Sequence, residues 1–268
     1  MKLRFYCLLI IFQVSFITGA IYAQISPPGL GKAQTGSWVA IGAVQDLNPS
    51  KSWQSMSYIG LGRKSNPDNF SPVYKPQLLV LNQELFYRIS NWKYSFAFSY
   101  RLQDEYNGNK PYYHSNPGMM QEFRIYSRIS YSIAAGAKLK LIPTIRQEFR
   151  RFMTTGFNNY DEVAQLRTRL KLQASFNINE RGSKIIGGIE QLFATSKTTN
   201  QSWSVFKSNE TRFSLYYSFT PAHEHFTLNI GYMNDFVEKH PYYDVHVIAA
   251  DLIFNNPLSI FHKRHNHI

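Results

Sequence analysis

The residues of this chain that could do chemistry are mostly arginines and glutamates threaded between apolar residues. In residues 145–152, IRQEFRRF, the side chains of Arg146, Glu148 and Arg150 fall on one side of a two-residue period. Ile145, Gln147 and Phe149 fall on the other side. This period is that of a β-strand, not a helix. Opposite charges on one strand face predict either a packed network of ion pairs or, with arginine in surplus, a lining that attracts anions.

Other kinds of reactive site are poorly represented. His246 is expected within a strand and on its inner face, with Asp244 two residues away, but no serine motif accompanies this pair. The histidines of the tail, His262, His265 and His267, are interpreted as part of a basic tail rather than as metal ligands. Cys7 is the only cysteine. The sequence therefore predicts no catalytic site, no cofactor and no metal.

The alternation that positions these charges recurs along almost the whole chain. In residues 93–103, KYSFAFSYRLQ, large apolar residues occupy every second position. Eleven such runs begin near residues 36, 52, 77, 93, 121, 137, 163, 183, 208, 225 and 243. No helical period competes with them. The chain is therefore expected to be all-β.

A soluble β-sandwich also alternates apolar and polar residues. Three features favour a barrel that crosses a membrane: runs of ten residues or more, an apolar face rich in Phe and Tyr, and alternation of short turns with longer loops. We therefore predict a single up-and-down antiparallel transmembrane β-barrel of 10–12 strands with an Arg/Glu-rich lumen. Because bacterial barrels have even strand numbers, eleven runs indicate ten or twelve strands, and the pattern does not decide between them.

The ends of the chain predict an exported protein. Residues 1–23 have the layout of a signal peptide, with Lys2 and Arg4 before an apolar run and small residues at Ala20 and Ala23. Residues 24–35 are expected to form an N-terminal extension, a poor candidate for an additional strand because of its prolines. The barrel is expected over 36–255 and a basic, His-containing tail over 256–268. This layout predicts a location in the bacterial outer membrane.

The net charge and its distribution limit the kinds of partner that the protein is expected to bind. The formal charge is +12, or +10 without Lys2 and Arg4, and aromatic residues make up 16% of the chain. Basic residues spread along strands, in an exported chain, argue against nucleic acid as a partner. The expected partners are outer-membrane lipid and small anionic solutes. The oligomeric state stays open.

Several stretches resemble one known family. They are GSW near residue 36, QEFR at the start of a strand, then IRQEFRRF, LRTRLKL, NETRFSLYYSF and LNIGYMNDF in that order. Together they resemble the uncharacterised outer-membrane β-barrel proteins of Gram-negative bacteria grouped as domain of unknown function 2490. The resemblance covers roughly residues 36–255 and implies an outer-membrane barrel, without an activity or catalytic residues to transfer. The chain departs from outer-membrane barrels in general at its end, where residues follow the aromatic Phe254.

The charged residues expected to line the lumen form one predicted network. Its members are Glu84, Arg88, Arg101, Glu122, Arg124, Arg128, Arg146, Glu148, Arg150, Arg167, Arg169, Lys171, Glu190, Glu210 and Arg212. The function expected from it is structural, or that of a narrow anion-preferring pore. The alternatives are a lipid-modifying enzyme of the outer membrane and a soluble periplasmic β-barrel or sandwich that binds a ligand.

Overall fold

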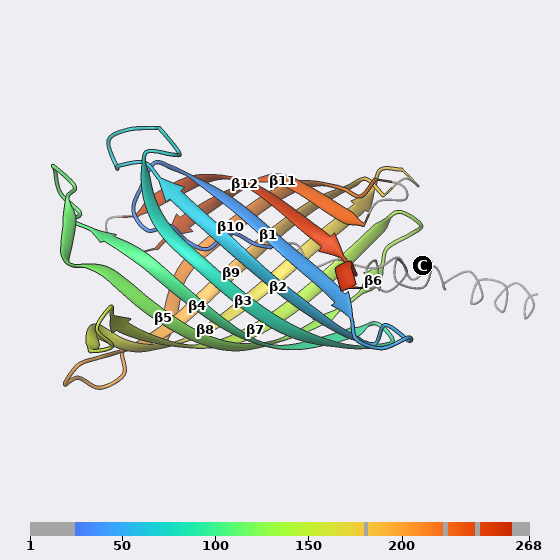
Figure 1. The fold of residues 1–268 in the computed structure, drawn as a ribbon, viewed down its shortest axis with the longest axis horizontal. Coiled ribbons are helices and arrows are strands. Elements are labelled where there is room, and N and C mark those ends of the chain that lie inside the picture. The colour runs from blue at the N-terminus through green and yellow to red at the C-terminus, as the bar shows by residue number, and fades with distance from the viewer. Residues whose placement is uncertain (1–24, 180–181, 222–224, 239–241, 259–268) are drawn as a thin grey trace, which may run out of the picture.

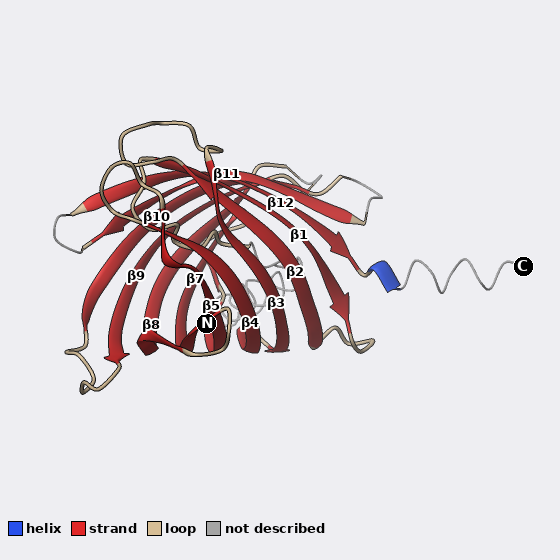
Figure 2. Ribbon diagram, turned by 60° about the vertical axis from the view of Figure 1, so that its left-hand side comes forward, coloured by secondary structure: helices blue, strands red, loops and turns tan. Residues whose placement is uncertain are grey.

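The chain folds into long, tilted β-strands that wrap around one axis (Figures 1 and 2). The computed structural model describes residues 25–179, 182–221, 225–238 and 242–258. The predicted signal peptide and all but the first residues of the predicted tail lie outside these ranges. The strands are β1 (Thr35–Asp46), β2 (Trp53–Lys64), β3 (Lys75–Ile89), β4 (Trp92–Tyr106), β5 (His114–Tyr131), β6 (Ile133–Ala134), β7 (Leu139–Thr154), β8 (Asn159–Asn177), β9 (Lys184–Thr198), β10 (Lys207–Phe219), β11 (Phe226–Val237) and β12 (Tyr243–Asn255).

These strands close into a single barrel. The order runs from β5 through β4, β3, β2 and β1 to β12, and on through β11, β10, β9 and β8 to β7. Pairing of β5 with β7 closes the ring. The two-residue β6 follows β5 and pairs with β7, so the wall consists of eleven long strands. The predicted all-β barrel is confirmed, and eleven lies within the predicted range.

The expectation of an even strand number is wrong, and the closing pair explains why an odd number is accommodated. β1 and β12 are parallel, with Thr35 beside His246 and Val44 beside Asn255. The other neighbouring strands are antiparallel. An odd ring of alternating strands must contain one such parallel pair. β1 and β12 therefore both end at the same end of the barrel.

The end of the barrel at which β1 and β12 finish is here called the turn end, and the opposite end is called the loop end. Of the described residues, the turn end carries 47–52, 90–91, 132–138 with the short β6, 178–179, 182–183, 220–221 and 225. The loop end carries 65–74, 107–113, 155–158, 199–206, 238 and 242. The loop-end connection between β7 and β8 is short, because β7 continues to Thr154 and β8 begins at Asn159. The alternation of loop lengths is therefore weaker than the sequence indicates.

Residues 25–34, here called the N-terminal segment, lie inside the barrel and do not form a strand. A Cβ added to Gly42 in β1 would lie 3.5 Å from Ile25 Cδ1, and one added to Gly36 would collide with Leu30. Since β1 runs from the loop end to the turn end, the segment follows its inner side toward the loop end. The chain therefore reaches the loop end, where β1 begins, without an additional strand. This explains how the barrel can have an odd number of strands.

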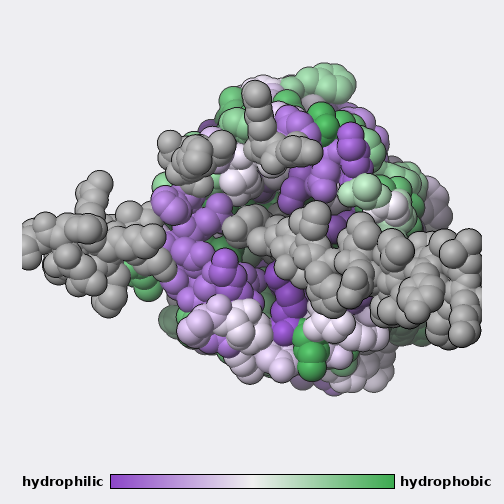
Figure 3. All heavy atoms as spheres, turned by 90° about the vertical axis from the view of Figure 1, so that its right-hand side faces the viewer, coloured by the Kyte–Doolittle hydropathy of each residue, from purple (hydrophilic) through white to green (hydrophobic). Residues whose placement is uncertain are grey.

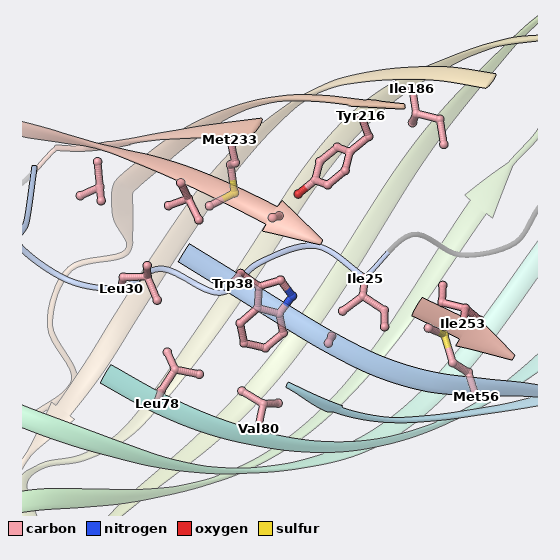
Figure 4. Close-up of a cluster of buried hydrophobic side chains, with 14 of the residues drawn as sticks. Ile25, Leu30, Trp38, Met56, Leu78, Val80, Ile186, Tyr216, Met233 and Ile253 are labelled. Atoms are coloured by element: carbon pink, nitrogen blue, oxygen red, sulfur yellow. The ribbon is translucent and has the colours of Figure 1, made fainter. Parts of the chain in front are cut away.

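The interior has two unlike walls, and the N-terminal segment covers the apolar one. Ile25 and Leu30 pack with Trp38, Leu78 and Val80 in a buried cluster (Figure 4). Other members come from β10–β12, among them Tyr216, Met233, Val245, Val247 and Ile253. Burial of a side chain such as Leu30 contributes roughly 1.5–3 kcal/mol. The apolar wall thus binds the segment, and the segment keeps this wall away from water.

The outer face of the barrel is predominantly apolar. Phe96 in β4, Leu170 in β8 and Leu215 in β10 are 61%, 47% and 57% exposed. Exposed residues of the same kind occur on all eleven long strands, among them Val39, Ile59, Leu81, Ile125, Ile145, Ile189, Ile230 and Ile248. The large apolar residues that alternate in residues 93–103, among them Tyr94, Phe96 and Phe98, lie on this outer face. Among the described residues, no helix is long and apolar enough to span a membrane.

Candidate functional site

The charged wall of the interior carries a network of ion pairs, the most distinctive chemical feature of the barrel. Its ion pairs form three groups, centred on Glu84, on Glu148 and on Glu210, and Gln165 joins the last two by accepting hydrogen bonds from Arg150 and Arg167. The network extends from β3 to β11 across the inner face. Its arginines are Arg124, Arg128, Arg146, Arg150, Arg167, Arg169 and Arg212, and its carboxylates are Glu84, Glu122, Glu148, Glu190, Glu210 and Asp235. The charged lumen that the sequence predicts is confirmed.

Glu148 in β7 is the centre of the network. Its carboxylate lies 2.6 Å from Arg146 Nε, 3.2 Å from Arg169 Nη1 and 3.3 Å from Arg124 Nη1. Arg124 comes from β5 and Arg169 from β8, the two neighbours of β7. Glu148 is 1% exposed. One carboxylate therefore ties three adjacent strands together, out of contact with water.

Glu122 in β5 plays a similar part toward the loop end. Its oxygens lie 2.6 Å from Arg124 Nη2 and 2.6 Å from Arg150 Nη2. Arg150 also donates to Gln165 in β8 at 2.5 Å. Charge-assisted bonds of this length are the stronger kind of hydrogen bond. The register of β5, β7 and β8 thus places the guanidinium donors of these strands beside the oxygen acceptors of their neighbours.

The network continues through β9 and β10 to β11. Arg169 Nη2 lies 2.5 Å from Glu190, Arg212 Nη2 lies 2.5 Å from Glu210, and Arg212 Nε lies 3.0 Å from Asp235. Asp235 is absent from the predicted network. It lies in LNIGYMNDF, on the same strand face as Met233 and Val237. Because most residues around it are apolar on both faces, the two-residue pattern does not show which face of this strand points inward.

Three residues of the predicted network, Arg88, Arg101 and Lys171, line the wall and form no ion pair with another described residue. Among the described residues, Arg88 Nη2 donates to Gln54 at 3.3 Å, and Lys171 Nζ contacts Ser26 Oγ at 3.4 Å. Arg101 pairs in register with Glu122, yet its Nε has no hydrogen-bond partner in the described part of the chain. These residues add positive charge to the wall beyond that of the ion pairs.

The N-terminal segment is held between the two walls. Ser26 touches Lys171 on the charged wall, and Lys64 donates to the backbone oxygen of Leu30 at 3.0 Å. A Cβ added to Gly29 would lie 2.7 Å from Arg212 Nη2 and 3.0 Å from an Asp235 oxygen. A side chain at position 29 would therefore disturb the ion pair of Arg212 with Asp235. Glycine lets the backbone approach that pair closely.

The prediction that His246 lies on the inner face is wrong. His246 and Asp244 are exposed on the outer face, with His246 Nε2 3.2 Å from Asp244 and Nδ1 2.6 Å from the Tyr232 hydroxyl. The inner positions of β12 are instead Val245, Val247 and Ala249, which pack in the apolar wall. Both faces of β12 carry apolar residues, so alternation does not identify the inner one. Among the described residues, no group of three or more His, Cys, Asp or Glu side chains could hold a metal ion.

At the loop end, an ion pair joins two connections. Lys110 Nζ lies 3.0 Å from Asp68, which links residues 107–113 to residues 65–74. The hydrogen bond and the charge of Asp68 raise the pKa of Lys110 above its usual value. Both groups are exposed, so this pair contributes little to stability.

Comparison with known proteins agrees with this architecture. A search of curated proteins finds no significant match. The model of one protein family, described as protein of unknown function (DUF2490), matches residues 35–245. The match begins at β1 and ends within β12, so it includes every strand of the charged wall. The chain belongs to this family of proteins of unknown function.

Proposed function

We propose that the protein is an integral β-barrel of the bacterial outer membrane whose lumen is closed by its own N-terminal segment and is anion-preferring when that segment is displaced. The observation that carries the membrane location is the outer face. Large apolar side chains are exposed on every long strand, with Phe96 61% and Ile248 60% exposed. Soluble monomers rarely expose contiguous apolar surfaces of this extent. A soluble binding module is therefore the weaker alternative.

The closed lumen is supported by contacts of the N-terminal segment with both walls. Ser26 reaches the charged wall, while Ile25 and Leu30 pack on the apolar wall. Barrels of eight strands are filled by side chains and those of sixteen hold aqueous channels, so eleven strands leave limited space. While the N-terminal segment occupies the lumen, we assign the charged network the structural role expected from the sequence rather than that of a pore lining. The surplus of cations on the charged wall supports the preference for anions.

The test is to refold the chain without residues 1–23 into lipid bilayers and record current in potassium chloride. We expect a heat-dependent shift in gel mobility, β-structure, and silence or rare brief steps. Large stable steps in the intact chain would contradict closure by the N-terminal segment. Protein that stays soluble without detergent and never enters bilayers would contradict the membrane location.

Substitution of Leu170 by arginine tests the same location in a second way. Leu170 is 47% exposed near the middle of β8, on the outer face. An arginine near the bilayer midplane costs roughly 2–4 kcal/mol in folding free energy, measured by urea titration in lipid vesicles. Leu47→Arg, at the turn end, is the matched control and is expected to cost less than about 1 kcal/mol. Equal costs for the two variants would argue against a lipid-facing outer wall.

A further inference from the structure

A row of neighbouring inward residues near the turn end carries cations and hydroxyls but no carboxylate. Backbone register places Arg88 beside Lys93, Lys93 beside Ser130, Ser130 beside Thr144, and Thr144 beside Lys171. These five residues, from β3, β4, β5, β7 and β8, are here called the cationic row. All of them are only partly buried. Hydrophilic residues are also numerous on the face of the barrel at this end (Figure 3).

The cations of the row have little local compensation. Among the described residues, Lys93 Nζ lies over the Phe86 ring, 3.8 Å from its centroid, and Arg88 donates to the neutral Gln54. Lys171 contacts the Ser26 hydroxyl. Glu190, which follows Lys171 in register, is engaged by Arg169 at 2.5 Å. Each of the three cations therefore keeps donors that another acceptor could use.

The ion pairs beside the row face it with their positive ends. The side chain of Arg128 is 23% exposed while that of its partner Glu84 is 2% exposed. Arg146 is 16% exposed and its partner Glu148 is fully covered. Glu84 also accepts hydrogen bonds from Ser95 and Tyr126, which occupy both of its oxygens. Solvent in this part of the lumen thus meets guanidinium groups rather than carboxylates.

The hydroxyls supply neutral donors between the cations. Thr144 Oγ1 lies 2.9 Å from Ser130 Oγ, and when Thr144 donates in this pair the Ser130 proton is left to point elsewhere. Cations and hydroxyl donors together are the groups that bind oxyanions in proteins. With neighbouring strands about 4.8 Å apart, the row is roughly 19 Å wide. This width exceeds one phosphate and suits an anion with several charges.

We infer that the cationic row is a binding site for soluble oxyanions, and that it takes polyanions of the phosphate class more tightly than single phosphate. The inference rests on the proposed anion-preferring lumen and specifies its ligand class and position. Arg88, Lys93 and Lys171 supply charge, Ser130 supplies a hydrogen bond, and Arg128 and Arg146 contribute from the adjoining network. The site lies near the turn end, where an open mouth would admit solute.

The test measures binding of tripolyphosphate to the refolded chain by titration calorimetry, in a detergent and buffer without phosphate. We expect tripolyphosphate to bind at least tenfold more tightly than inorganic phosphate, and both more tightly than chloride at equal ionic strength. Arg88→Gln combined with Lys93→Gln should weaken tripolyphosphate binding at least tenfold. Lys207→Gln, an exposed lysine at the loop end, is the control and should bind as the parent does.

Several outcomes would overturn the inference. Unchanged binding by the double variant would do so, as would a parent that binds tripolyphosphate no better than chloride. A short-chain phosphatidylglycerol that binds as tightly as tripolyphosphate would identify a lipid headgroup as the ligand instead. The heat-dependent mobility shift shows that each variant is folded. A chain that enters bilayers but binds no oxyanion would refute this site while leaving the proposed function intact.

Discussion

Deletion of residues 25–34 is expected to convert a silent barrel into one that conducts chloride in discrete steps. The N-terminal segment touches both interior walls, since Ser26 contacts Lys171 and Leu30 lies against Gly36 and Gly62. Its removal leaves a lumen lined by the ion-pair network on one side. Because cations outnumber carboxylates there, chloride should carry several-fold more current than potassium. The measurement is single-channel conductance, with the reversal potential taken in a potassium chloride gradient.

A single substitution tests the same closure if the protein with the deletion does not fold. Leu30→Asn weakens packing of the segment on Leu78 and Gly62 while the chain length is kept. It should conduct for a fraction of the time, between the parent and the deletion. Deletion of residues 259–268 serves as the control for shortening the chain. If the deletion folds, inserts and stays silent, the segment is not what closes the lumen.

Replacement of Glu148 by glutamine is expected to produce the largest loss of stability of any single substitution in the network. Glu148 is fully buried and lies within 3.3 Å of three guanidinium groups, those of Arg146, Arg169 and Arg124. Glutamine has nearly the same shape but no charge, so three guanidinium groups, two of them buried, lose their common partner. Breaking a buried pair in this way costs roughly 3–5 kcal/mol. Urea unfolding of the protein in lipid vesicles measures this cost.

Glu162→Gln is the matched control for that substitution. Glu162 lies at the loop end of β8, where it accepts a hydrogen bond from Gln165 at 3.0 Å and, within the part of the chain that the structure describes, forms no ion pair. Its replacement should change the free energy of unfolding by less than about 0.5 kcal/mol. Similar stabilities of the two variants would mean that the ion pairs around Glu148 do not hold β5, β7 and β8 together.

The sequence carried enough information to place the charged wall. In β7 and β8 the two faces differ sharply, since Arg146, Glu148 and Arg150 alternate with Ile145 and Phe149. A slip of one residue would turn all those charges outward, so only one register is acceptable. The inward positions of these residues followed directly, and their pairing with each other needed only the antiparallel order of neighbouring runs.

The sequence pattern could not show which residues form the apolar wall. β12 alternates Val245, Val247 and Ala249 with His246 and Ile248, so both of its faces are largely apolar. An apolar inner face is stable there because Ile25 and Leu30 of the N-terminal segment belong to the same buried cluster and keep water away from it. That contact joins residues more than 200 positions apart, and no local pattern records it. The misplacement of His246 and the omission of Asp235 both arose on this side of the barrel.

By itself, the sequence determined the all-β architecture, the eleven runs, and which residues of the charged wall point inward. It did so because a two-residue period with unlike faces has one favourable orientation between an apolar and a polar environment. Only the tertiary structure decided that β1 and β12 close the ring in parallel and that residues 25–34 run inside it. These depend on closure of the whole sheet and on contacts across the lumen, which single strands do not encode.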